Sequence, residues 1–98
     1  MNNRRLKGLP SWKRVRLVEY YLHLMYMTLL KKQTSSKEEE QSNLRKTFFN
    51  VVLRMERTLR CCNKEEIPVI LDYIKDCPDE MFKQFVWLSL RKCGHYSV

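Results

Sequence analysis

The feature that most constrains the fold is an apolar stripe in the middle of the chain. Between residues 44 and 62 an apolar side chain recurs every three or four positions, as Leu44, Phe48, Val51, Val52, Met55, Leu59 and Cys62. This spacing places all of them on one side of an α-helix about five turns long. Because such a helix must bury that side, the stripe predicts a helix packed against further helices.

The start of this helix carries its own signals. Ser35 with Glu38, and Ser36 with Glu39, both match the capping box, in which a serine and a glutamate satisfy each other's backbone N–H groups. Three consecutive glutamates at 38–40 also favour the positive end of a helix dipole. We therefore expect the helix to begin here, behind a polar linker over residues 33–37.

A second long helix is predicted upstream, over residues 12–32, with Ser11 as its N-cap. One face carries apolar residues at helical spacing, and an adjacent face is also apolar, so most of the circumference is apolar: Val15, Val18, Leu22, Met25 and Leu29, then Leu17, Tyr21 and Leu24. A helix of this kind is typical of the centre of a bundle or of an oligomer interface.

Two further segments complete the chain. A short helix is expected from about residue 68, where Pro68 suits the first position and Ile67, Ile70, Leu71 and Ile74 form one apolar face. A last helix is expected to begin at Pro78 and to end at Cys93, before Gly94. The sequence therefore predicts an all-α single domain, a compact bundle of three long helices and one short one.

Positive charge is concentrated near the N-terminus. Of 19 lysines and arginines, eight lie in residues 1–34 against one acidic residue, whereas residues 64–98 carry five basic and six acidic residues. We treat residues 1–11 as a basic arm in front of the helical domain. Lys13, Arg14 and Arg16 occupy the first turns of a helix, where the dipole disfavours cations, so local helix stability does not account for them.

Two functional classes are consistent with this pattern. The first is a non-enzymatic adaptor that docks on a protein partner with an acidic or apolar groove, with a homodimer as one form of association. Too much of the helix at 12–32 is apolar for one small core, and docking would bury the excess. Aromatic residues dominate such interfaces, and the candidates are Trp12, Tyr20, Tyr26 and Trp87.

The alternative class is a module that binds the phosphate backbone of RNA or DNA. Its candidate contacts, which also suit an acidic protein, are Arg4, Arg5, Lys7, Lys13, Arg14, Arg16, Arg57 and Arg60. Trp12 lies among these cations, where its ring can stack on a base. The chain contains no alanine, which indicates nucleotide bias or a gene constrained by an overlapping reading frame, as in compact viral genomes. A small viral accessory protein fits either class.

Catalysis is not expected, and neither is a cofactor. The chain has two glycines, and it lacks a phosphate-binding loop, a nucleophile elbow and a paired-carboxylate signature. Glu19 and His23 are four residues apart on one helix and can touch, but nothing around them indicates a nucleophile. We expect His23 to be partly buried.

No metal site is predicted, although one set of soft ligands was considered for zinc. In an up-down bundle the ends of two helices gather at one pole, which brings together Cys61, Cys62, Cys93 and His95. Cys77 belongs at the opposite pole, and the sequence has no Cys-x2-Cys pair, so a zinc site is not predicted.

The chain is expected to be intracellular, in the cytoplasm or the nucleus, with reduced thiols. Basic residues followed by an apolar stretch at 17–30 imitate a secretory signal, but Glu19 and His23 interrupt it and no cleavage site follows. Association with membranes is not expected, because the apolar face of the first long helix is needed for the core.

Overall fold

The computed structural model describes residues 6–95. Its helices are α2 (Ser11–Thr34), α3 (Glu38–Leu59), α4 (Ile67–Ile74) and α5 (Glu80–Lys92). No β-strand occurs within the described residues. The all-α prediction is therefore confirmed.

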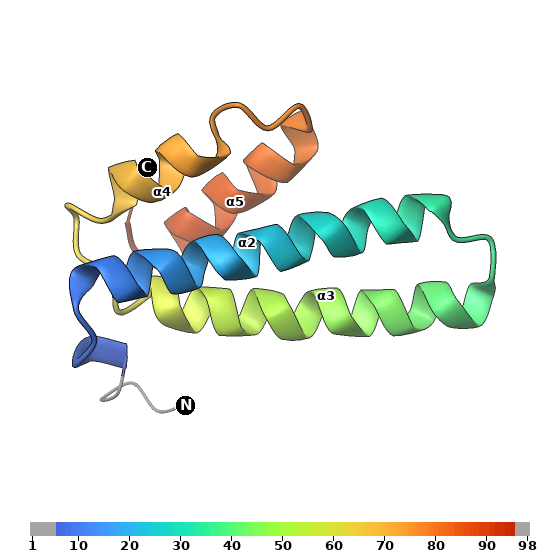
Figure 1. Cartoon of the computed structure of the whole chain (residues 1–98), viewed down its shortest axis with the longest axis horizontal. Coiled ribbons are helices and arrows are strands. Elements are labelled where there is room, and N and C mark those ends of the chain that lie inside the picture. The colour runs from blue at the N-terminus through green and yellow to red at the C-terminus, as the bar shows by residue number, and fades with distance from the viewer. Residues whose placement is uncertain (1–5, 96–98) are drawn as a thin grey trace.

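The two longest helices form an antiparallel hairpin, and the two shorter helices pack along one side of it (Figure 1). α4 contacts α2, and α5 contacts α3. The described chain has a radius of gyration of 14.0 Å, as expected for about 100 residues folded around one core.

The core is built by all four helices. Side chains with no exposed surface come from each of them: Val18 and Met25 of α2, Met55 and Leu59 of α3, Ile70 of α4 and Leu90 of α5. The predicted stripe supplies most of the contribution of α3, with Val52 and Cys62 buried and Phe48 and Val51 partly buried. The periodic pattern therefore identified the buried side of α3 correctly.

The N-terminal caps differ from the prediction. α2 begins at Ser11 itself, so that Pro10 occupies the cap position and no side chain caps the helix. Lys37 occupies the cap position of α3, again without a side-chain cap, so both capping-box predictions are wrong. The reason is that Ser35 still belongs to the end of α2, where its N–H donates to the carbonyl of Lys31 at 3.0 Å. The three glutamates do occupy the first turn of α3, as predicted.

The last helix begins two residues later than predicted and ends where expected. The Asp79 carboxylate accepts a hydrogen bond from the N–H of Phe82 at 3.0 Å, which caps a helix starting at Glu80. At the other end Gly94 adopts a φ of +85°, in the left-handed region that favours glycine. The N–H of His95 then donates to Leu90 at 3.0 Å in a Schellman motif.

Candidate functional site

An apolar hollow opens on the surface between α3 and α5. It measures about 270 Å³ and is lined by Phe49, Val52, Leu53 and Glu56 of α3 and by Phe85, Leu88, Ser89 and Lys92 of α5. Three of its large apolar side chains are more than half exposed, with 62% of Phe49, 59% of Leu53 and 58% of Leu88 accessible to water. Exposed apolar side chains gathered around a hollow are typical of an interaction surface.

A second hollow of about 230 Å³ adjoins the first on the other side of Phe49. It lies between α2 and α3 and is lined by Thr28, Leu29, Lys32, Leu44, Arg45, Phe48 and Phe49. The Phe48 ring lies between the two, with its centroid 6.2 Å from that of Phe49 and 5.5 Å from that of Phe85. Because Phe49 lines both hollows, they form one surface, which we call the α3 groove.

Cations border the α3 groove at both ends. Lys32 and Arg45 line the hollow between α2 and α3, and Lys92 lines the hollow between α3 and α5. Among the described residues that line the groove, Glu56 is the one carboxylate, and it is buried with its Oε2 3.5 Å from Nζ of Lys92. The exposed charge of the residues that line the groove is therefore positive, whereas the first turn of α3, beyond Leu44, carries Glu38, Glu39 and Glu40.

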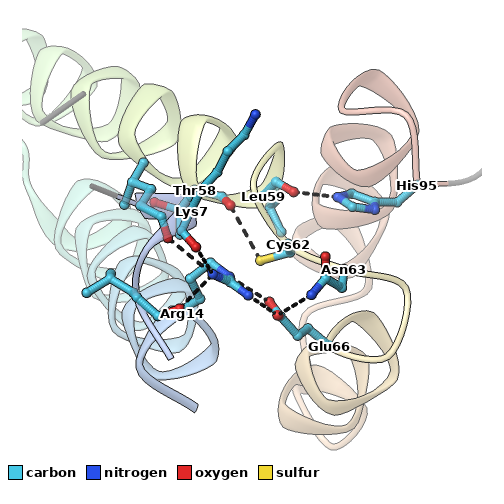
Figure 2. Close-up of polar contacts among 10 residues, drawn as sticks. Lys7, Arg14, Thr58, Leu59, Cys62, Asn63, Glu66 and His95 are labelled. Carbon is cyan, nitrogen blue, oxygen red and sulfur yellow. Dashed lines mark hydrogen bonds and ion pairs between the residues drawn. The ribbon is translucent and has the colours of Figure 1, made fainter. Parts of the chain in front are cut away.

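A second cluster of polar contacts ties residues 6–9 to the bundle. The guanidinium of Arg14 donates to both carboxylate oxygens of Glu66, from Nε at 3.2 Å and from Nη2 at 2.6 Å. Its Nη1 also donates to three backbone carbonyls, at distances between 2.8 and 3.2 Å, those of Leu6, Lys7 and Leu9 (Figure 2). Exposure of the two side chains is 7% and 2%, so the ion pair is enclosed.

This enclosure shifts the ionisation of its neighbours. Burial alone would raise the pKa of Glu66, but hydrogen bonds from Arg14, Cys62 and Ser11 and the charge of Arg14 lower the pKa below its ordinary value. Burial, followed by the hydrogen bond and charge of Glu66, raises the pKa of the Cys62 thiol to about 12. Glu66 is therefore held as a carboxylate and Cys62 as a neutral thiol.

The structure changes the set of cations predicted to meet a partner. Arg14 leaves this set, because its side chain is buried and its donors are used inside the fold. Arg4 and Arg5 lie outside the described residues. The other predicted cations, none of which the core encloses, are exposed: Lys7, Lys13, Arg16, Arg57 and Arg60.

Arg54 is a further exposed cation that the predicted set does not contain. It lies three residues before Arg57, and both arginines line a hollow of about 300 Å³ with Leu6, Tyr21 and Thr58. The spacing of three residues on one helix was the signal that could have added Arg54 to the set. Residues 41–64, which run past the end of α3, carry six cations and one carboxylate, the buried Glu56, so the exposed charge of this segment is positive.

The four predicted aromatic anchors do not gather at the α3 groove. Trp12 and Tyr20 are exposed on α2, with the ammonium of Lys13 5.5 Å from the Trp12 ring centroid, and Trp87 is exposed on α5. Tyr26 is instead half-buried, and its ring centroid lies 5.4 Å from that of Phe82 in the core. Tyr26 is therefore a packing residue.

Three residues of the groove wall were missed by the prediction. Phe49 and Leu53 are four residues apart beside the predicted stripe, which is the spacing of a second apolar edge on the same helix. Leu88 and Met81 are two of the apolar residues of the last helix, and the structure exposes 58% and 81% of these side chains. A run of apolar residues on consecutive turns does not say which of them finds a partner.

The cysteines and histidine considered for zinc do lie at one end of the molecule. Cys62 donates to the carbonyl of Thr58 at 3.4 Å, and His95 contacts the carbonyl of Leu59 (Figure 2). Cys93 donates to the carbonyl of Glu56 at 3.5 Å. In the part of the chain that the structure describes, no group of three or more potential metal ligands occurs. His23 is exposed, where the sequence predicted partial burial.

No protein-family model, curated protein or solved structure matches this chain. Within residues 6–95, no helix has both the length and the apolar character that crossing a bilayer requires. The features of the chain that bear on its function are therefore the α3 groove and the exposed cations.

Proposed function

We propose that this chain is a non-enzymatic interaction module, a bundle of three longer helices and one short helix that docks on a protein partner. The observation that carries this proposal is the α3 groove, where Phe49, Leu53 and Leu88 are each more than half exposed around a hollow. Burying a side chain of this size contributes about 1.5–3 kcal/mol relative to leaving it in water. A few such residues dominate the affinity of most protein interfaces.

The groove is also built to bind without much rearrangement. Its lining side chains belong to the helices α2, α3 and α5, and the Phe48 ring packs against the rings of both Phe49 and Phe85. Side chains held in place before binding lose less conformational entropy when the partner arrives. In this arrangement the chain provides the groove and the partner provides the segment that enters it, whereas the sequence predicted a groove on the partner.

The test is a comparison of two serine variants in the cells that naturally make this chain. Leu53→Ser removes an apolar wall of the groove, and Val69→Ser removes a side chain that is 50% exposed on α4. Both variants should unfold within about 0.5 kcal/mol of the native protein, because both positions are on the surface. We expect quantitative affinity capture to show a protein bound by the native chain and by Val69→Ser and lost from Leu53→Ser. Equal capture by all three chains would contradict the proposal.

Binding to nucleic acid is the second candidate function, and the exposed cations of residues 41–64 favour it. The two arginines at positions 54 and 57 line a hollow, and residues 41–64 expose six cations without an exposed carboxylate. Arg54→Glu/Arg60→Glu is the appropriate variant, since Arg14 is part of the fold. Titration with single- and double-stranded oligonucleotides should show a steep dependence on salt that this variant removes. Undetectable binding at low salt would exclude this function.

The homodimer, the location in the cytoplasm or nucleus and the viral accessory role stay predictions. Light scattering over a range of concentrations tests the first of them. A monomer at high concentration would show that the exposed apolar residues of α2, Tyr20, Met27 and Leu30, do not drive association.

A further inference from the structure

We infer that the α3 groove binds an acidic amphipathic helix of the protein partner. This inference depends on the proposed docking function and specifies the chemistry of the segment that docks. Three properties of the groove carry it: its length, the distribution of its apolar walls and the sign of the charge at its ends.

The length of the groove fits a short helix. Its lining residues on α3 run from Leu44 to Glu56, and a rise of 1.5 Å per residue makes this distance about 18 Å. A partner helix of about twelve residues, slightly more than three turns, covers the same distance. A longer helix is accommodated as well, since both ends of the groove open to water.

The walls fit the spacing of one apolar helix face. The two hollows share Phe49 and follow one another along α3, the first lined from Leu44 to Phe49 and the second from Phe49 to Glu56. Apolar residues at positions i, i+4, i+7 and i+11 of a partner helix form a continuous stripe, and the pairs at its two ends can enter the two hollows. Leu53 and Leu88 then flank the second pair, and Leu29 and Leu44 flank the first.

The charge at both ends favours an acidic partner. Lys32 and Arg45 line one hollow and Lys92 lines the other. Against these three cations the groove lining has one carboxylate, that of Glu56, which is buried. Aspartate or glutamate on the flanks of the partner helix therefore meets a cation at each end.

Lys92 is placed to hold a partner carboxylate without leaving its own. Its Nζ lies 3.5 Å from Glu56, and 64% of the side chain is exposed. An ammonium group has three donors, so those not directed at Glu56 face the groove opening. A carboxylate of the partner can share this lysine while Glu56 keeps its counter-charge.

A second copy of this chain is a poorer occupant. Pairing two grooves would bring two sets of three cations together, in a protein whose formal charge is already +8. The last turns of α2 and α5 are basic, with Lys31 and Lys32 in one and Arg91 and Lys92 in the other. These helices therefore present positive ends where the groove requires negative ones.

The test uses the full chain and three labelled peptides of fourteen residues. The first peptide has leucine at positions 1, 5, 8 and 12 and glutamate on both flanks of that stripe. The second replaces each glutamate with lysine, and the third scrambles the first so that its leucines no longer share a face. Fluorescence anisotropy should show that the first peptide binds at least about tenfold more tightly than either of the others.

Two variants of the chain place the binding on the groove. Leu53→Glu introduces a negative charge into the apolar wall and should weaken the acidic peptide at least about tenfold. Val69→Glu introduces the same charge on α4 and should leave the affinity unchanged. Both positions are exposed, so their free energies of unfolding should stay within about 0.5 kcal/mol of the native value.

The other outcomes each overturn the inference. Equal binding of the acidic and scrambled peptides would show attraction by charge alone, and equal binding to both variants would place the peptide elsewhere. If the native protein forms a dimer and Leu53→Glu dissociates it, the occupant of the groove is a second copy. If an oligonucleotide displaces the peptide from native protein but not from Arg54→Glu/Arg60→Glu, the surface binds nucleic acid. A captured partner that depends on Leu53 and carries no acidic helix would reject this inference and leave the proposed function intact.

Discussion

Two buried glutamates of the described chain each pair with a cation, and the two pairs differ in how much of the cation is exposed to water. In the pair of Glu66 with Arg14 both side chains are enclosed, at 2% and 7% exposure. In the pair of Glu56 with Lys92 the carboxylate is 4% exposed and the lysine 64%. The donors of Arg14 are directed at Glu66 and at three backbone carbonyls, whereas Lys92 keeps donors directed toward solvent.

The difference between the two pairs distinguishes a charge whose partners all lie inside the fold from a charge that stays accessible to another molecule. An enclosed charge must find all its partners inside the fold, and Arg14 does so by drawing residues 6–9 and the turn at Glu66 against α2. A charge at the edge of an apolar groove can find part of its partners in another molecule. A glutamate paired with a cation thus holds residues 6–9 to the bundle in one case and lines the α3 groove in the other.

Breaking the enclosed pair should have the largest effect on stability. Arg14→Met leaves Glu66 buried without its counter-charge, and we expect a loss of about 3–5 kcal/mol in the free energy of unfolding, measured by urea denaturation. Arg14→Met/Glu66→Leu, which removes both charges, should recover a large part of that loss. A loss below about 1 kcal/mol in the single variant would mean that the pair is not enclosed in solution.

The rates at which Cys62 and Cys77 react should show that Cys62 is the more enclosed of the two thiols. Because burial and Glu66 raise the pKa of Cys62 to about 12, only about one molecule in ten thousand carries its thiolate at pH 8. We expect iodoacetamide to modify Cys62 at least about 100-fold more slowly than the half-buried Cys77, as followed by peptide mass spectrometry. In concentrated urea the two rates should converge. Equal rates in the folded protein would contradict the enclosure of Cys62.

Acid should weaken the enclosed pair. The pKa of Glu66 is lower in the folded chain than in the unfolded chain, so its stabilisation is fully present above about pH 4.5 and is lost as pH falls through the folded value. Urea denaturation between pH 7 and pH 2.5 should therefore show a decline in stability that is shallower in Glu66→Gln. Parallel declines in the two proteins would assign the acid sensitivity to other carboxylates.

The smallest effect is expected at the open pair. Lys92→Ala removes an ammonium group that is largely in water, and we expect a loss of about 1 kcal/mol or less in urea denaturation. The acidic peptide described above should nevertheless bind more weakly to this variant, with a smaller dependence on salt. A loss as large as that of Arg14→Met would show that the two pairs do not differ in the way proposed.

The helices were predictable because their signals are local. The stripe from Leu44 to Cys62 repeats at helical spacing, and Gly94 supplies a positive φ within the last turn. The capping boxes predicted at Ser35 and Ser36 do not form, because two helix ends compete for the same few residues. The end of α2 and the start of α3 share the same short connection, and α2 retains Ser35.

The candidate site was less predictable because its residues acquire their roles from distant ones. Phe49 and Leu53 belong to an apolar edge of α3, and only the position of α5 leaves them exposed beside a hollow. Arg14 was grouped with its exposed neighbours Lys13 and Arg16 because all three look alike in the sequence. Its partner Glu66 is 52 residues away, which no local pattern reveals.

The sequence by itself determined which segments are helical, which side of α3 turns to the core and where positive charge accumulates along the chain. These properties follow from spacing, helix ends and composition, which act over a few residues. Only the tertiary structure decided which charges are enclosed and which apolar side chains remain uncovered. Both depend on how α4, α5 and residues 6–9 pack against the hairpin of α2 and α3, because burial is a property of the whole fold and not of any one helix.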